Sequence, residues 1–255
     1  ECIRAQAVNG VNARNLADVV TGTILVRLTM APTLRVQGIV RGAGQRGTVV
    51  GDSHPDGKSR GLVQRPSGLD TVSFGTGAVM QMMRTLPTGA VLSGVVEVTD
   101  GSLSAALMNY FQASEQFTSV ALVASRFEDG LLESAGGYVV QLLPEVNREQ
   151  LAVMAERLDR DFSDPLAVLA QAERDPAELM GEILYGMRFA QTRDSSLSFG
   201  CRCSALRVLS SLSTLPKADI RELMSSEEHL HITCDYCGRQ YELPPKALAG
   251  LLSES

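Results

Sequence analysis

Four cysteines near the end of the chain have the residue type and spacing of a metal site. Cys201 and Cys203 are separated by one residue, Cys234 and Cys237 by two, and 30 residues lie between the two pairs. Tetrahedral zinc is well served by two close pairs of thiolates, because each pair supplies two ligands and the chain between them folds back. Gly238 follows the last cysteine and permits a tight turn around the metal. The spacing therefore predicts a four-thiolate Zn²⁺ site.

The segment that carries these cysteines, residues 196–255, is short and has a modest apolar content. Domains of this size often need a structural metal or disulfides to be stable. A structural zinc contributes on the order of 10–16 kcal/mol of apparent binding free energy, which exceeds the stability of a typical domain. We expect that loss of the metal unfolds this segment, so that chemistry at the sulfurs becomes a change of conformation.

Zinc-bound thiolates are deprotonated, and exposed ones are open to oxidation. Oxidation of either pair destroys the set of four ligands. The expected products are the local disulfides Cys201–Cys203 and Cys234–Cys237, because each pair stays close along the chain after the metal leaves. The tight Cys-x-Cys ring is strained and therefore readily reduced again. These properties predict a reversible, redox-active switch.

The region before the switch, residues 1–144, has the texture of an α+β domain. It is rich in glycine and β-branched residues, and turn residues interrupt it at short intervals. A stretch that is apolar without alternation predicts a buried helix, and a second helix is expected with Ser102 as its N-cap. Strands are predicted at residues 33–40, 48–50, 91–98, 119–125 and 137–143, and the two helices at 16–30 and 103–117.

Residues 145–195 differ from this core domain and predict a helical linker. They contain eleven acidic and six basic residues, with leucines at three- and four-residue spacing. Pro165 and Pro176 each follow an aspartate, a typical start of a helix. Two or three short amphipathic helices are expected. They form either a stable helical subdomain or a metastable linker. The predicted organisation is a core domain at 1–144, a linker at 145–195 and a zinc-binding redox-switch domain at 196–255.

Charge and hydropathy exclude several functions. The net charge is −6, and the cysteine-bearing segment has seven acidic residues against six basic ones. Nucleic acid is therefore disfavoured as a partner, because phosphate binding needs a basic face. No apolar run approaches the roughly 20 residues of a bilayer span, and the first residues lack a signal-peptide pattern. We expect a cytoplasmic protein with no membrane partner, in which clustered cysteines serve metal or redox chemistry.

The cysteine pattern and its flanks resemble those of the bacterial 33 kDa redox-regulated heat-shock chaperones, the 33 kDa chaperonin family. The likeness covers most of residues 34–245. The matching segments are Phe199-Gly200-Cys201-Arg202-Cys203-Ser204, Thr214-Leu215-Pro216, Ile232-Thr233-Cys234-Asp235-Tyr236-Cys237-Gly238, Arg41-Gly42-Ala43-Gly44, and Tyr110-Phe111 with Ser114-Glu115-Gln116.

This resemblance implies a holdase, which is a chaperone and not an enzyme. The family binds unfolding proteins and prevents their aggregation under oxidative stress. The reduced, zinc-bound form is an inactive monomer. Oxidation releases zinc, unfolds the switch domain and the linker, and yields an active homodimer.

Two other functions are compatible with the cysteines. The first is a thiol–disulfide oxidoreductase that uses Cys234 and Cys237, although such pairs usually begin a helix in a βαβ fold. The second is a constitutive zinc-ribbon binding module, which oxidation inactivates. His229 and His231 lie near the second pair, but four thiolates already complete a tetrahedral set. Cys2 is interpreted as a bystander, and residues 42–47 match a dinucleotide fingerprint without the helix that it requires.

Overall fold

The computed structural model describes residues 1–142, 148–172, 175–225 and 229–252. The chain divides into two compact units, Glu1–Phe199 and Gly200–Ser255. Residue 144, the predicted end of the core domain, lies outside the described ranges. Within those ranges no helix is both long enough and apolar enough to cross a membrane. The chain is a mixed α and β protein, as the sequence predicts.

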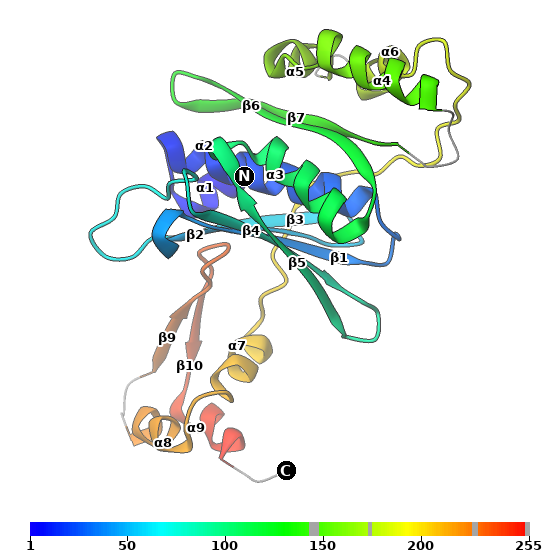
Figure 1. The fold of residues 1–255 in the computed structure, drawn as a ribbon. Helices are drawn as coiled ribbons and strands as arrows, with labels where there is room; N and C mark the ends of the chain where they lie inside the picture. Colours follow the sequence, from blue (N-terminus) through cyan, green and yellow to red (C-terminus); the bar gives the residue numbers. More distant parts are fainter. Residues whose placement is uncertain (143–147, 173–174, 226–228, 253–255) are drawn as a thin grey trace. The chain divides into compact units, whose positions relative to one another are not determined.

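The larger unit is a stack of four layers (Figure 1). A six-stranded sheet is covered on one face by α2 (Gly10–Leu28) and α3 (Leu103–Tyr110). A long hairpin lies over the other side of these helices, and three further helices cover the hairpin. Because α2 is packed between a sheet and a hairpin, it needs apolar residues around its circumference rather than along one stripe.

The six-stranded sheet has the order β5-β4-β1-β2-β3-β8. Neighbouring strands are antiparallel, except that β8 pairs in parallel with β3. The short α1 (Cys2–Gln6) packs against β3. The strands are β1 (Arg35–Arg41), β2 (Thr48–Ser53), β3 (Lys58–Gln64), β4 (Ala78–Thr85), β5 (Val91–Val98) and β8 (Ser198–Phe199).

Glycines in the sheet let α2 approach its backbone. A Cβ atom on Gly51 would lie 2.6 Å from Thr23 Oγ1 and 2.9 Å from Val19 O. A Cβ atom on Gly61 would lie 2.6 Å from Leu16 Cδ1. A side chain at Gly51 would meet the backbone of α2, and one at Gly61 would displace the Leu16 side chain, so these glycines set the depth of the main core.

The hairpin of β6 (Thr118–Glu128) and β7 (Leu131–Leu142) separates two apolar cores. Its inner side packs on α2 and α3. Its outer side packs on the helices of the predicted linker, which are α4 (Arg148–Asp161), α5 (Pro165–Ala172) and α6 (Pro176–Ile183). The buried residues of this outer core are Leu122, Ala124, Tyr138, Met154, Leu158, Phe162, Val168, Leu169, Leu179 and Ile183.

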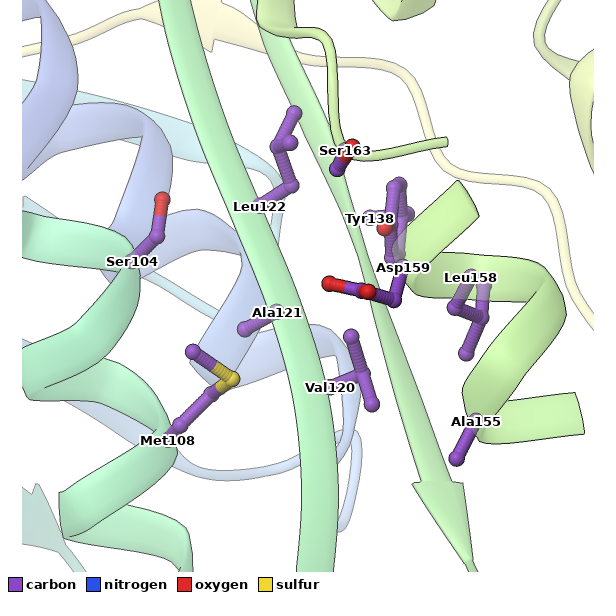
Figure 2. A pocket seen from close by; sticks show the side chains of 10 residues that line it. All are labelled: Ser104, Met108, Val120, Ala121, Leu122, Tyr138, Ala155, Leu158, Asp159 and Ser163. Carbon is purple, nitrogen blue, oxygen red and sulfur yellow. The ribbon is translucent and has the colours of Figure 1, made fainter. Parts of the chain in front are cut away.

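Helix α4 does not fill the space over the hairpin. A cavity of about 340 Å³ remains between α3, the two strands and α4. Figure 2 shows Ser104 and Met108 of α3 on one side of it and Ala155, Leu158 and Asp159 of α4 on the other. Two of the lining residues, Asp159 and Ser163, are exposed, so this cavity opens to solvent beside α4. The packing between α4 and the hairpin is therefore incomplete on this side.

The smaller unit is built from short elements. Its hairpin pairs β9 (Leu230–Thr233) with β10 (Gln240–Leu243), and α8 packs against α9. In the described part of this unit the buried side chains are Ile220, Leu243 and Leu248. The remaining helices are α7 (Ala205–Leu212), α8 (Lys217–Ser225) and α9 (Pro245–Leu248).

One carboxylate is fully buried in the six-stranded sheet. Asp52 accepts hydrogen bonds from Arg35 at 2.6 and 2.9 Å and from Arg60 at 2.9 Å. His54 Nε2 lies 3.4 Å from Asp52 Oδ2. Burial opposes ionisation of Asp52, but His54 and Arg35 outweigh it and hold the pKa of the carboxyl well below its usual range. Asp52 is therefore the ionised counterion of two arginines.

Several sequence predictions of local structure are confirmed. The strand at Val91–Val98 has the predicted bounds, and strands lie at the other predicted places. Ser102 caps α3 by accepting a hydrogen bond from Ala105 N–H at 3.2 Å. Pro165 and Pro176 begin helices, as predicted.

The predicted bounds of the long helix are wrong. The helix begins at Gly10 rather than at residue 16, through residues of low helix propensity. The buried Asn12 explains the difference, because its amide donates to Asp70 O at 2.6 Å and accepts from Val72 N–H at 3.0 Å. The second helix ends at Tyr110 and continues as a π-helical turn, Phe111–Glu115. Strands β3, β4 and β8 of the six-stranded sheet were not predicted.

Asp52→Asn is expected to destabilise the larger unit by about 3 kcal/mol, because it leaves two arginines without their counterion. The lowered pKa sets the sign of the pH dependence. The contribution of Asp52 is complete above the pKa of an unfolded aspartate, about 4, and is lost as the pH falls below it. Urea unfolding of the parent protein and of Asp52→Asn at pH values from about 3 to about 7 measures the difference in their free energies of unfolding.

Asp161→Asn is the matched control, because Asp161 is an exposed aspartate whose partner is Arg160 at 2.8 Å. It should unfold like the parent protein at every pH. Equal stability of Asp52→Asn and the parent at neutral pH would contradict the role given to Asp52.

Candidate metal centre

The second cysteine pair lies in the turn of the β9–β10 hairpin. Cys234 N–H donates to Arg239 O at 2.8 Å, and Cys234 O accepts from Gly238 N–H at 2.8 Å and from Cys237 N–H at 3.3 Å. Gly238 has a φ of 70°, and a Cβ atom there would meet nothing within 4 Å. Glycine is therefore favoured here for its left-handed backbone rather than for space, which confirms the predicted turn.

The first pair precedes a helix. Ser204 caps α7 by accepting a hydrogen bond from Arg207 N–H at 3.3 Å. Cys203 is the residue before this cap, so it lies at the end of the helix where the backbone dipole is positive. That end of a helix favours a thiolate over a thiol.

The structure brings the four predicted ligands together. Their Sγ atoms all lie within 4.8 Å of one another. The Sγ atoms of Cys201 and Cys234 are 3.7 Å apart, and those of Cys203 and Cys237 are 3.4 Å apart. A tetrahedral ion with Zn–S bonds of about 2.3 Å requires sulfurs about 3.8 Å apart. The cluster therefore has the size of a four-thiolate metal site.

The sulfurs differ in acidity. Burial opposes ionisation of Cys203, but the Tyr241 phenol and the three other thiols outweigh it and lower the pKa of Cys203 to about 7. Burial and the neighbouring Cys203 raise the pKa of Cys237 to about 12. One thiolate thus forms near neutral pH, and its negative charge opposes ionisation of a second thiol beside it. A cation among the sulfurs removes this conflict, because it stabilises all four thiolates.

Two residues outside the predicted set of ligands, Tyr241 and Arg239, lie beside it. The phenol of Tyr241 is the main cause of a raised pKa of the Arg239 guanidinium, and the sulfurs of Cys203 and Cys237 raise it further. A four-thiolate zinc centre carries a net charge of −2. Arg239 supplies one compensating positive charge, and its position directly after the Cys-x-x-Cys-Gly turn is the signal that marks it.

The histidines and the fifth cysteine are not part of the cluster. His229 directly precedes β9, with its Nδ1 atom 3.9 Å from Glu242 Oε1, and His231 is opposite Glu242 in the register of β9 and β10. Cys2 packs against the core of the larger unit, and burial raises the pKa of its thiol. Residues 42–47 form a short turn between β1 and β2 and open no long helix. These observations agree with the minor roles expected for them.

Comparison with known proteins identifies relatives along almost the whole chain. Residues 1–244 match the Hsp33 protein family. The 33 kDa chaperonin of Syntrophotalea carbinolica is 25% identical over 248 residues, which cover 93% of this chain and 85% of that protein. The 33 kDa chaperonin of Symbiobacterium thermophilum is 29% identical over 243 residues, which cover 91% and 81%.

The fold is similar to a solved one. The crystal structure of the 33 kDa chaperonin, or heat shock protein 33 homolog, of Thermotoga maritima aligns with a TM-score of 0.80 at 20% identity. The alignment covers 98% of this chain and 88% of that one. The two proteins therefore share the α+β architecture.

The reduced protein is expected to carry one zinc ion per chain, and Cys203→Ser is expected to lose it. When Cys203→Ser loses the metal, residues 200–252 should also lose protection from hydrogen exchange, because a structural zinc supplies the folding free energy of a small unit. Cys2→Ser is the matched control and should keep both metal and protection. Elemental analysis and hydrogen exchange decide the matter; a metal-free reduced protein with a protected tail would contradict the assignment.

Proposed function

The chain belongs to the Hsp33 family of chaperones, and we propose that it is a redox-regulated holdase. In the reduced form Cys201, Cys203, Cys234 and Cys237 hold Zn²⁺ and the chaperone is inactive. Oxidation of these sulfurs releases the metal and unfolds the small unit and the linker. The activated protein binds unfolding clients and prevents their aggregation under oxidative stress.

The observation that carries this proposal is the imbalance between the sulfur cluster and the core around it. The small unit brings four Sγ atoms within 4.8 Å of one another, but its described part buries just three side chains. So small a core offsets little of the entropy of ordering the chain. A metal supplies the missing free energy, and its loss is therefore equivalent to unfolding.

The oxidation step has a simple balance. Two zinc-bound thiolates give up two electrons to hydrogen peroxide, which takes two protons from the solvent; two Zn–S bonds break, one S–S bond forms, and two molecules of water result. Two peroxides convert all four sulfurs. The products are Cys201–Cys203 and Cys234–Cys237, because once the unit unfolds only neighbours in sequence stay close. Neither disulfide restores the cluster of four donors, so the unit stays unfolded until it is reduced.

The linker transmits this change to the larger unit. The extended segment after α6 ends in β8, where Ser198–Phe199 pairs with β3 directly before Gly200 and Cys201. An unfolded tail adds conformational freedom at this end of the linker. The linker helices are held by the outer core on the β6–β7 hairpin, and the cavity beneath α4 weakens that contact.

Release of the linker exposes apolar surface on two sides. The outer face of the hairpin loses its cover at Leu122, Ala124 and Tyr138, and the helices lose theirs at Met154, Leu158 and Leu169. Surfaces of this kind bind unfolding proteins, and the acidic residues of the linker keep them soluble. The same surfaces drive the formation of a homodimer in the oxidised state, whereas the reduced protein is a monomer.

An oxidoreductase is less compatible with the geometry. The turn with Cys234 and Cys237 is followed by strand β10 and not by a helix that would lower a thiol pKa. The pKa of Cys237 is instead raised to about 12, mainly by burial. A constitutive zinc-ribbon module makes the opposite prediction about oxidant, since oxidation would inactivate it.

Peroxide is expected to turn the inactive, reduced protein into a suppressor of citrate synthase aggregation, with zinc release and activity rising together. The physical reason is that the metal and the folded small unit are thermodynamically coupled. Light scattering and a zinc dye measure the two quantities in one sample. Full activity of the reduced, zinc-loaded protein, or turnover of insulin disulfides, would contradict the proposal.

Ala155→Leu is expected to raise the amount of oxidant needed for activation. The added methyl groups fill part of the cavity under α4 and stabilise the linker by about 1 kcal/mol, roughly a fivefold change in the released fraction. Ala152→Leu places the same side chain on the exposed side of the helix and is the control. Identical activation curves for the two variants would show that α4 is not part of the switch.

A further inference from the structure

Strand β5 forms an edge of the six-stranded sheet (Figure 1), and it carries exposed apolar side chains. Val91, Leu92 and Val95 are 50%, 47% and 57% exposed. Edge strands of soluble proteins are usually protected by lysine, proline, a bulge or a covering element, because their free backbone groups pair with other chains. Val91–Val98 contains no lysine and no proline, and its register with β4 has no bulge.

The hydrogen-bond phase identifies the groups that face outward. Leu86 N–H donates to Ala90 O at 2.8 Å, which makes these residues a bonded pair at the end of the β4–β5 hairpin. Bonded and non-bonded pairs alternate along an antiparallel ladder. The N–H and C=O groups of Val91, Ser93, Val95 and Glu97 therefore point away from β4. Among the described residues no backbone hydrogen bond joins them to another element.

The opposite edge of the sheet, at β3, is covered by other parts of the chain. Ser198–Phe199 of the linker adds to β3 as a short parallel strand, and Ser198 N–H donates to Gly57 O at 3.2 Å. Farther along β3, the Gln6 side chain accepts from Val63 N–H at 3.0 Å. The molecule thus covers one edge with its own extended segment and a side chain. This sheet demonstrably accepts an added strand at its edge.

Strand β5 is held in place from its inner side. Glu115 accepts hydrogen bonds from Tyr110 Oη at 2.7 Å and from Arg84 Nη1 at 2.9 Å, which ties the π-helical turn to β4. Gly94 of β5 packs directly on Ser114 and Tyr110, with no room for a side chain. An edge that is already ordered loses little entropy when a partner binds.

We infer that the edge of β5 is a docking site for an extended segment of an unfolding client, which pairs with it as a seventh strand. Backbone groups of the segment satisfy those of Val91, Ser93, Val95 and Glu97, and apolar side chains pack on Val91 and Val95. The exposed Glu97 favours a segment with a basic residue at that end. The inference rests on the proposed chaperone function and names a binding surface separate from the linker.

The test uses the reduced, zinc-loaded full chain, so that its outcome does not depend on the redox switch. Binding of one strand at this edge does not by itself prevent aggregation, which in the proposed function also needs the apolar surface that the linker releases. The probe is a fluorescent octapeptide of alternating valine and threonine with a lysine at one end. It is expected to bind, and methylation of its backbone nitrogens on one edge is expected to weaken binding about tenfold or more, which corresponds to 1.4 kcal/mol. Equal binding of the methylated peptide would overturn strand addition without affecting the holdase assay.

The variant arm locates the site. Val95→Lys should weaken binding of the peptide about tenfold or more, whereas Val11→Lys should not, since Val11 is 54% exposed on α2. Zinc content and circular dichroism check folding, and the methylated peptide decides the matter in the parent protein if Val95→Lys misfolds. Unchanged peptide binding by Val95→Lys would overturn the inference. Loss of self-association alone, measured by sedimentation, would also overturn it, because that result would assign the edge to a second copy of the chain.

Discussion

The coordination of one cation by four sulfurs is the interaction on which the proposed mechanism depends. The small unit buries three side chains in its described part, whereas the larger unit has two extended apolar cores. Hydrophobic burial stabilises the larger unit in any redox state. In the small unit the same physical role falls to sulfur donors, whose ability to bind depends on their oxidation state. The proposed redox sensitivity is thus assigned to one part of the chain.

The linker has intermediate character. Its helices bury apolar residues on the β6–β7 hairpin, so they are a packed layer of the larger unit rather than a loose tether. Yet α4 leaves a cavity beneath it, and α5 and α6 are each only eight residues long. Helices this short are not stable in isolation and persist only through tertiary packing. Of the two interpretations that the sequence allowed, a stable subdomain and a metastable linker, the geometry supports features of both.

Negative charge is balanced in different ways in the two units. In the sheet, Asp52 is matched by Arg35 and Arg60, so its negative charge is balanced by side chains of the chain itself. At the cysteine cluster the negative charges repel one another unless a cation is present, as the separated pKa values of Cys203 and Cys237 indicate. The first network supports a permanent core, and the second is the basis of our proposal that the fold of the small unit depends on a metal.

The sequence by itself determined the local features: the ligand types and spacing, the Gly238 turn, the Ser102 cap, the helix starts at Pro165 and Pro176, and the strand at Val91–Val98. Each depends on neighbours within a few residues, where dihedral preferences and capping act. Only the tertiary structure decided the start of α2, strand β4, the burial of Asp52, the pairing of β8 with β3 and the free edge of β5. These depend on partners far away in sequence, and a local window contains neither the partner nor the solvent that it displaces.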